Sequence, residues 1–232
     1  MIWKLFSDQR SKLMKMNKVI LRSISGTVFV LVMLAGLLLN RFLFATLFAF
    51  VAAGMIWEVF SISKSKSDRL LWTLAILLFT ALIFLLAFRH GEFSGKLLLC
   101  LFIMIWSSDV GAFCIGSLLG QKAGSHKLAP TISPNKSWAG FWGGMAFSII
   151  ASLILHYFGL LSFQPLHCIA FAVIVHCLGV CGDLLESKLK RKCGVKDSSN
   201  LIPGHGGLLD RFDSSLAAIP GGCLYLLIFN LL

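Results

Sequence analysis

Charged residues are scarce in this chain of 232 residues: they account for 13% of it, and only 10 residues are Asp or Glu. With so little charge, 57% apolar residues and a mean hydropathy of +0.86, the sequence leaves no room for a large soluble domain and indicates a membrane protein. The seven cysteines include no Cys-x-x-Cys pair, so we interpret them as small apolar packing residues. The first apolar run lacks an evident small-residue cleavage site, which disfavours a secretory signal.

Seven apolar stretches approach the ~20 residues that a helix needs to cross a bilayer. We therefore predict an all-α, polytopic transmembrane helix bundle of about seven spans. The predicted spans are Ser23–Leu39, Phe42–Ile62, Leu70–Phe88, Leu97–Leu119, Ser137–Leu161, Pro165–Gly182 and Ser214–Leu232.

Lys and Arg are unevenly distributed between the segments that connect these spans. If the amino terminus is cytoplasmic, 18 of the 21 basic residues lie on the cytoplasmic side, and only Arg41, Arg89 and Lys96 lie on the other. Basic residues stay on the cytoplasmic side of short loops, so this orientation is the expected one, with the carboxyl terminus outside. It places loops 120–136 and 184–213 on one cytoplasmic face, where they can build a site together.

The basic charge and the span pattern divide the chain into three regions. We expect residues 1–22 to form a basic interfacial segment, residues 23–96 to form amino-terminal transmembrane helices, and residues 97–232 to form a transmembrane region whose two cytoplasmic loops carry a site. The net charge of +11 follows the cytoplasmic face, and no soluble domain could present a basic groove. We therefore expect anionic membrane lipid, and not nucleic acid, as the partner of this charge.

Two acidic residues lie inside predicted spans. A charge at the depth of Asp109 costs at least ~2.5 kcal/mol unless it is solvated or paired. Taken alone, Asp109 fits equally well a polar cavity within the bundle or a structural aspartate bonded to Ser107 or Ser108. For Glu58, whose neighbours are less polar, we favour a structural role.

The loop 120–136 ends in residues suited to phosphate. Ser133 and Lys136 can donate to phosphate oxygens, although a solvated basic loop would have a similar composition. Gly140, Gly143 and Gly144 follow on one helical face, where we expect another helix to approach closely.

A polar stripe continues the sixth span out of the membrane. Its members recur at steps of three, four, seven and eight residues, which places them on one face of a helix. A solvated surface helix with an ordinary salt bridge is the alternative, but this stripe begins at the membrane boundary, which favours a site. The stripe consists of Asp183, Glu186, Ser187, Lys190 and Arg191.

The segment before the last span combines glycines with charge. Gly204, Gly206 and Gly207 form a loop whose backbone can approach a ligand. Two aspartates and an arginine follow directly before the apolar run, an unusual combination for an ordinary turn. Carboxylates suit a hard divalent cation, and basic side chains with glycine backbone suit phosphates, so the motifs together indicate phosphoryl chemistry on a lipid.

These motifs resemble those of the phosphatidate cytidylyltransferase family (CDP-diacylglycerol synthases). Ser187-x-x-Lys190-Arg191-x4-Lys196-Asp197 followed by Pro203-x-His205-Gly206-Gly207-x-x-Asp210-Arg211-x-Asp213 is similar to the family signature. Asp109-x-x-Ala-Phe-x-x-Gly116, Ser133-Pro134-x-Lys136-Ser137 and Gly182-Asp183-x-x-Glu186-Ser187 resemble the family in order and spacing. The resemblance runs from Trp106 to the end. Ala139 stands where the family usually has glutamate, and Phe113 where it usually has tyrosine.

The resemblance implies transfer of CMP from CTP to phosphatidic acid, which gives CDP-diacylglycerol and pyrophosphate, with Mg²⁺ as cofactor. It implies an integral protein of the bacterial inner (plasma) membrane whose active site faces the cytoplasm; a homodimer stays open. The implied catalytic residues are Asp183, Asp210, Lys190, Arg191 and Arg211. The implied substrate-binding residues are Ser133, Lys136, Ser187, His205, Gly206 and Gly207, and the implied cation ligands are Asp183, Asp210, Asp213 and Asp109.

Two other functions fit parts of this inventory. A CTP-dependent lipid or polyprenol kinase would use similar residues but would release CDP in place of pyrophosphate. A non-enzymatic transporter would explain Asp109 and the basic loops, but not the charged cluster between Asp183 and Asp213.

Overall fold

The computed structural model describes the backbone of residues 2–122 and 126–231, and side chains from residue 20 onward. Within these residues the chain forms seven helices and one short β-hairpin. The elements in chain order are α1 (Ile2–Leu38), α2 (Arg41–Ile62), α3 (Lys66–Ala87), α4 (Lys96–Leu119), β1 (Lys127–Ala129), β2 (Ser133–Ser137), α5 (Trp138–Tyr157), α6 (Pro165–Lys192) and α7 (Leu209–Ile228).

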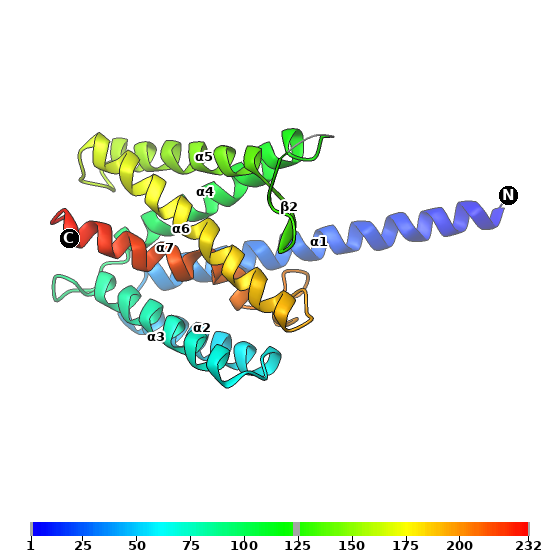
Figure 1. The fold of residues 1–232 in the computed structure, drawn as a ribbon, viewed down its shortest axis with the longest axis horizontal. Helices are drawn as coiled ribbons and strands as arrows, with labels where there is room; N and C mark the ends of the chain where they lie inside the picture. Colours follow the sequence, from blue (N-terminus) through cyan, green and yellow to red (C-terminus); the bar gives the residue numbers. More distant parts are fainter. Residues whose placement is uncertain (1, 123–125, 232) are drawn as a thin grey trace.

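The helices form one bundle in which sequential helices run in opposite directions (Figure 1). The α5–α6 connection and the carboxyl terminus lie at one end. The β-hairpin and the α6–α7 connection lie toward the other end. The two segments that the charge pattern places on one face are therefore on the same side of the bundle.

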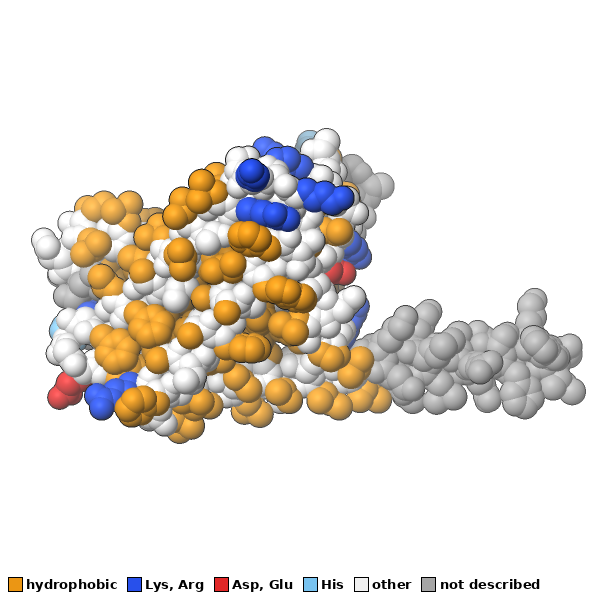
Figure 2. Space-filling model, turned by 90° about the horizontal axis from the view of Figure 1, so that it is seen from below, with side chains coloured by type: hydrophobic (Ala, Val, Ile, Leu, Met, Phe, Trp, Pro, Cys, Tyr) orange, Lys and Arg blue, Asp and Glu red, His pale blue; other side chains and the backbone are white. Residues whose placement is uncertain are grey.

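Six of the helices in the described part of the chain are long and apolar enough to cross a membrane. The seventh helix, α7, is not among them, because its first turns carry Asp210, Arg211 and Asp213. Hydrophobic side chains cover the long side of the bundle, whereas Lys and Arg side chains on this face gather near its ends (Figure 2). Phe42, at 70% exposure, and Leu71, at 64%, belong to this apolar exterior. The prediction of an all-α integral membrane protein is confirmed.

A cluster of phenylalanines forms the centre of the bundle. Phe48, Phe102 and Phe212 come from α2, α4 and α7, and each is no more than 1% exposed. The rings of Phe102 and Phe212 meet edge to face, with centroids 6.1 Å apart, a favoured aromatic arrangement. This contact fixes the first turns of α7, and the acidic residues that flank Phe212, against the middle of the bundle.

Glycines bring α4 and α5 together, as the sequence predicts. A Cβ atom at Gly140 would lie 3.0 Å from the carbonyl oxygen of Ala112, and one at Gly143 would collide with Ile115. Small residues permit this close approach of two helix backbones. The close packing holds the hairpin, which directly precedes α5, near the polar end of α4.

The hairpin and the last two helices refine the predicted boundaries. The loop 120–136 contains an antiparallel hairpin in which Lys127 pairs with Ser137. The polar stripe is helical, as predicted, because α6 continues to Lys192. Residues 184–192 and 209–213 are helical, so the second loop covers only 193–208. The interfacial role predicted for residues 1–22 depends mainly on side chains before residue 20, which lie outside the described part of the structure. It stays a prediction.

Candidate functional site

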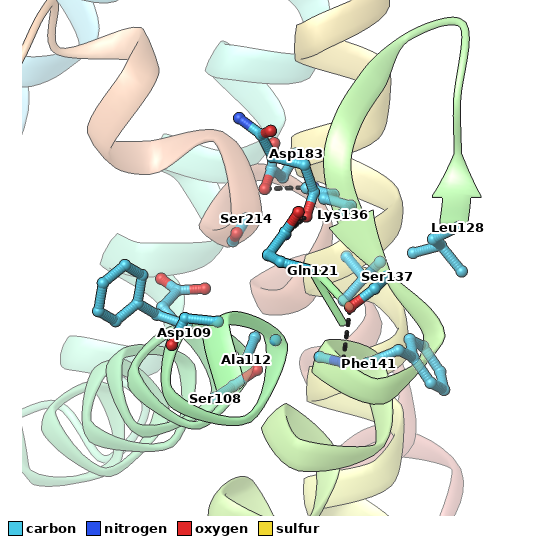
Figure 3. A pocket seen from close by; sticks show the side chains of 16 residues that line it. Ser108, Asp109, Ala112, Gln121, Leu128, Lys136, Ser137, Phe141, Asp183 and Ser214 are labelled. Atoms are coloured by element: carbon cyan, nitrogen blue, oxygen red, sulfur yellow. Dashed lines mark hydrogen bonds and ion pairs between the residues drawn. The ribbon is translucent and has the colours of Figure 1, made fainter. Parts of the chain in front are cut away.

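A polar cavity of the candidate site lies between α4, the hairpin, α6 and the start of α7. Its volume is about 470 Å³, within the range of small-molecule sites. Asp109, Lys136, Asp183 and Ser214 line it although they come from four different elements (Figure 3). The polar interpretation of Asp109 is therefore the one that the structure supports.

Lys136 and Asp183 form an ion pair across this cavity. Both side chains keep about a quarter of their surface exposed, so the pair is accessible from the cavity. Ser187, one turn further along α6, donates a hydrogen bond to the other oxygen of Asp183 at 3.3 Å. An accessible ion pair of this kind suits a ligand that carries phosphates and a bound cation, because such a ligand can replace both halves of the pair.

A second, smaller cavity of about 210 Å³ adjoins the first. Asp109 lines both cavities. Asp210, Arg211 and Asp213 contribute the polar wall of the smaller cavity, together with His205. Gly26, Phe29 and Val30 of α1 form part of its other wall.

Carboxylates crowd around the two cavities. Burial, together with the negative charges of Asp183, Glu186 and Asp109, raises the pKa of Asp213 well above its usual range. Asp213 precedes the predicted span Ser214–Leu232 and accepts only one hydrogen bond from the described residues, from the backbone N–H of Ser214 at 2.6 Å. Several negative charges at one point favour the binding of a cation.

Asp210 has its oxygens occupied by protein donors. Its Oδ1 accepts from Lys190 Nζ at 2.6 Å, and its Oδ2 accepts from the N–H groups of Gly207 at 2.7 Å and Ser198 at 2.9 Å. Burial alone would raise the pKa of Asp210, but the bonds from Lys190, Gly207 and Ser198 outweigh it and hold the pKa below its usual value. In this arrangement Asp210 fixes the loop 193–208 to α6.

Lys190 is an internal link between two acids. Its ammonium lies 2.6 Å from Glu186 Oε2 and 2.6 Å from Asp210 Oδ1, and its side chain is only 10% exposed. Breaking such a buried pair leaves an uncompensated charge, which is costly. Lys190 therefore joins α6 to α7 and does not line either cavity in this arrangement.

Glu58 of α2 is an organising residue whose importance the sequence did not reveal. It is fully buried, and its oxygens accept from Ser198 Oγ, Ser199 Oγ and the N–H groups of Leu208 and Leu209, all between 2.7 and 2.8 Å. The structural role that we favoured for it is confirmed. The only signal in the sequence was a carboxylate in a span, and its partners lie 140 residues or more away.

The glycine loop is also tied to α1. The hydroxyl of Ser25 lies 2.7 Å from His205 Nδ1 and donates to the carbonyl of Pro203 at 2.9 Å. Gly204 and Gly206 have φ angles of +77° and +80°, which favour glycine. The His205 side chain therefore points toward the wall that α1 contributes to the smaller cavity.

Six of the predicted site residues line neither cavity: Lys190, Ser187, Gly206, Gly207, Ser133 and Arg191. Ser133 pairs with Ala129 in the hairpin and lines neither cavity. Arg191 donates to the carbonyl oxygens of Ile132 at 3.4 Å and Val195 at 3.0 Å, so in this arrangement it braces the hairpin against the loop after α6. Asn135 and Gln121, by contrast, line the larger cavity and were not predicted.

The predicted cation ligands do not form an all-protein cage. Among the described residues, no three or more His, Cys, Asp or Glu side chains are grouped closely enough to hold a metal ion. This arrangement still fits Mg²⁺, which is usually held by one or two carboxylates, water and substrate phosphates. Asp109, Asp183 and Asp213 present oxygens at or beside the cavities, whereas the oxygens of Asp210 already have four donors.

Comparison with known proteins identifies a family. The model of the cytidylyltransferase family matches residues 68–229, which covers α3 to α7 and the hairpin. Proteins named phosphatidate cytidylyltransferase are similar over shorter stretches. The one from Staphylococcus epidermidis strain RP62A is 42% identical over 125 residues, which are 54% of this chain and 46% of that protein. The one from Haemophilus influenzae is 43% identical over 138 residues, 57% of this chain and 46% of that protein.

A third relative of the same name, from Staphylococcus aureus strain COL, is 43% identical over 119 residues, 51% of this chain and 44% of that protein. The chain thus spans about half the length of the curated relatives it matches. The matched family region contains every residue that lines the larger cavity, but it excludes Glu58 and the α1 wall of the smaller cavity.

Proposed function

The chain belongs to the cytidylyltransferase family, and on that premise we propose that it transfers CMP from CTP to phosphatidic acid, forming CDP-diacylglycerol and pyrophosphate. The observation that carries the proposal is the convergence of Asp109, Lys136 and Asp183 from three separate elements on one cavity. The relatives are named phosphatidate cytidylyltransferase, which supports the choice of substrates.

The reaction needs charge neutralisation more than proton transfer. An oxygen of the lipid phosphate attacks the α-phosphorus of CTP in line, a new P–O bond forms, and the bond to the bridging oxygen of pyrophosphate breaks. The nucleophile is already an anion, so no strong general base is required. Basic side chains that face the reacting phosphates lower the barrier by stabilising the negative charge.

The residues at the two cavities would have different roles in this reaction. Lys136 binds phosphate oxygens when a nucleotide displaces it from Asp183, and Arg211 supplies a second positive charge at the smaller cavity. Substrates held one in each cavity would meet at Asp109, which lines both. Lys190, Asp210 and Glu58 act as positioning residues, because their bonds hold α6, α7 and the glycine loop together.

Mg²⁺ is the proposed cofactor. Asp109, Asp183 and Asp213 are the residues that would hold it. When bound, the ion supplies a positive charge that neutralises phosphate oxygens.

The decisive experiment measures products. Purified protein in detergent with CTP, phosphatidic acid and Mg²⁺ is expected to release pyrophosphate, and Asp183→Asn to reduce turnover by at least about 100-fold. Glu92→Gln is the matched control, because this exposed carboxylate lies in the α3–α4 connection, away from both cavities. Release of CDP in place of pyrophosphate would show a kinase, and transport without nucleotide consumption would exclude an enzyme.

We also propose that the cavities face the cytoplasm from a bacterial inner membrane, with anionic lipid around the basic end. The bacterial relatives and the basic residues on the hairpin side support this orientation. An alkaline phosphatase fused to the carboxyl terminus is expected to be active, because that terminus lies at the opposite end of the bundle from the hairpin (Figure 1). An inactive fusion would contradict the orientation. A homodimer stays a prediction.

A further inference from the structure

A third cavity, which the proposed reaction does not use, lies on another face of α6. Its volume is about 370 Å³, and α3, α6 and α7 form its walls. It shares no lining residue with either cavity of the candidate site. We call it the outer groove; the residues that carry the argument are Asp68, Leu71, Trp72, Leu185, Lys188 and Lys192.

The walls of the outer groove belong to the membrane-facing exterior. Leu71 is 64% exposed and Leu185 is 57% exposed, whereas Leu189 and Leu216 behind them are buried. Leu71 opens the predicted span Leu70–Phe88, and Leu185 lies three residues beyond the predicted span that ends at Gly182, so both exposed leucines lie where lipid chains meet the headgroups. An acyl chain is therefore the ligand that the walls suit.

The mouth of the outer groove lies at the polar end of α6, whose last turns carry four cations. Three of them are engaged: Lys190 with Asp210, Arg191 with backbone carbonyls, and Lys192 with Asp68 Oδ2 at 2.6 Å. Lys188 is exposed and forms no hydrogen bond or ion pair with any other described residue.

The charge at the mouth decides which lipid fits. The ion pair between Lys192 and Asp68 is neutral, so the unpaired ammonium of Lys188 leaves the mouth with one net positive charge. An anionic headgroup complements this charge, and a basic side chain near the membrane surface attracts anionic lipid by about 1 kcal/mol. A zwitterionic headgroup gains much less from the same lysine.

We propose that the outer groove binds one anionic phospholipid, with an acyl chain along Leu71, Trp72 and Leu185 and the headgroup phosphate on Lys188. This lipid is separate from the substrate. Only the α6–α7 contact lies between its site and the reaction site: a Cβ atom at Gly182, which lines the groove, would lie against the backbone oxygen of Asp213.

The test is native mass spectrometry of the purified full chain with equal amounts of dioleoyl phosphatidylglycerol and dioleoyl phosphatidylcholine. We expect the wild type to retain the anionic lipid preferentially. Lys188→Ala should weaken retention of the anionic lipid about fivefold, because the attraction of one lysine near the membrane surface for anionic lipid corresponds to about that change in affinity. Lys122→Ala, which removes the same charge from an exposed position outside the groove, is the matched control and should retain the lipid as the wild type does.

A second variant tests the walls without changing the charge. Ala75 lines the groove, so Ala75→Trp should fill it and reduce retention of both lipids. Equal retention of the two lipids by the wild type, or unchanged retention in both Lys188→Ala and Ala75→Trp, would overturn the proposal. A shift of Ala75→Trp from dimer to monomer without loss of lipid would show instead that a second copy covers the groove. None of these readings depends on nucleotide turnover.

Discussion

Replacement of Glu58 is the most informative perturbation, because this residue lies outside the matched family region and touches no cavity of the site. Glu58→Ala removes the acceptor of two hydroxyls and of two backbone N–H groups, those of Leu208 and Leu209. Each buried N–H left without an acceptor costs about 1–3 kcal/mol. Since Glu58 is fully buried, water cannot readily replace it, and we expect a loss of about 3–5 kcal/mol in the free energy of unfolding.

Glu58→Gln should destabilise the fold less than Glu58→Ala. It keeps one carbonyl oxygen as the acceptor for one of the two N–H groups, while its NH₂ group faces the remaining donors. We expect about half the loss of Glu58→Ala. The assays are thermal unfolding in detergent and CTP turnover, and turnover should fall at least about tenfold because Gly207 and Asp210 move with the start of α7. Glu92→Ala, which removes an exposed carboxylate, is the control. A Glu58→Ala protein that unfolds at the wild-type temperature would refute the reasoning.

Three further predictions concern packing, pH and the ion pair. Gly143→Leu should lower the free energy of unfolding by at least about 1–3 kcal/mol, because its side chain collides with Ile115; an unchanged midpoint in denaturant would contradict this. Burial, together with two neighbouring arginines, lowers the pKa of His205. As the pH falls, His205 therefore takes up its proton at a higher pH in the unfolded chain than in the folded one. The free energy of unfolding should fall as the pH drops through about 6.5 and below. In His205→Asn the unfolding temperature should depend less on pH over that range than in the wild type. The same pH dependence in both proteins would contradict the prediction. Lys136→Met should raise the KM for CTP at least about tenfold while the fold stays intact, since only a partly exposed ion pair with Asp183 is lost; a wild-type KM would exclude contact with the nucleotide.

The chain alone determined the membrane class and most of the fold. Apolar runs of about 20 residues can only be satisfied as helices in a bilayer, so the helix positions follow from composition, and those of α2 and α4 were predicted to within one residue. The glycines at 140, 143 and 144 likewise predicted close helix packing, because the reason is the local absence of a side chain. The motifs also placed Asp109, Lys136 and Asp183 in one site, and their convergence on one cavity is consistent with that.

Only the tertiary structure shows which hydrogen-bond partners come from other segments of the chain. The start of α7 at Leu209 depends on Glu58 of α2, which supplies the acceptors that no residue next to Leu208 provides. Asp210 shows the same over a shorter range: the family resemblance implied a cation ligand, but its oxygens hold Lys190, 20 residues away, and the glycine loop in this structure. Hydrogen bonds across more than a hundred residues leave no periodic trace in a sequence, because they depend on where the backbone brings each group and not on local spacing.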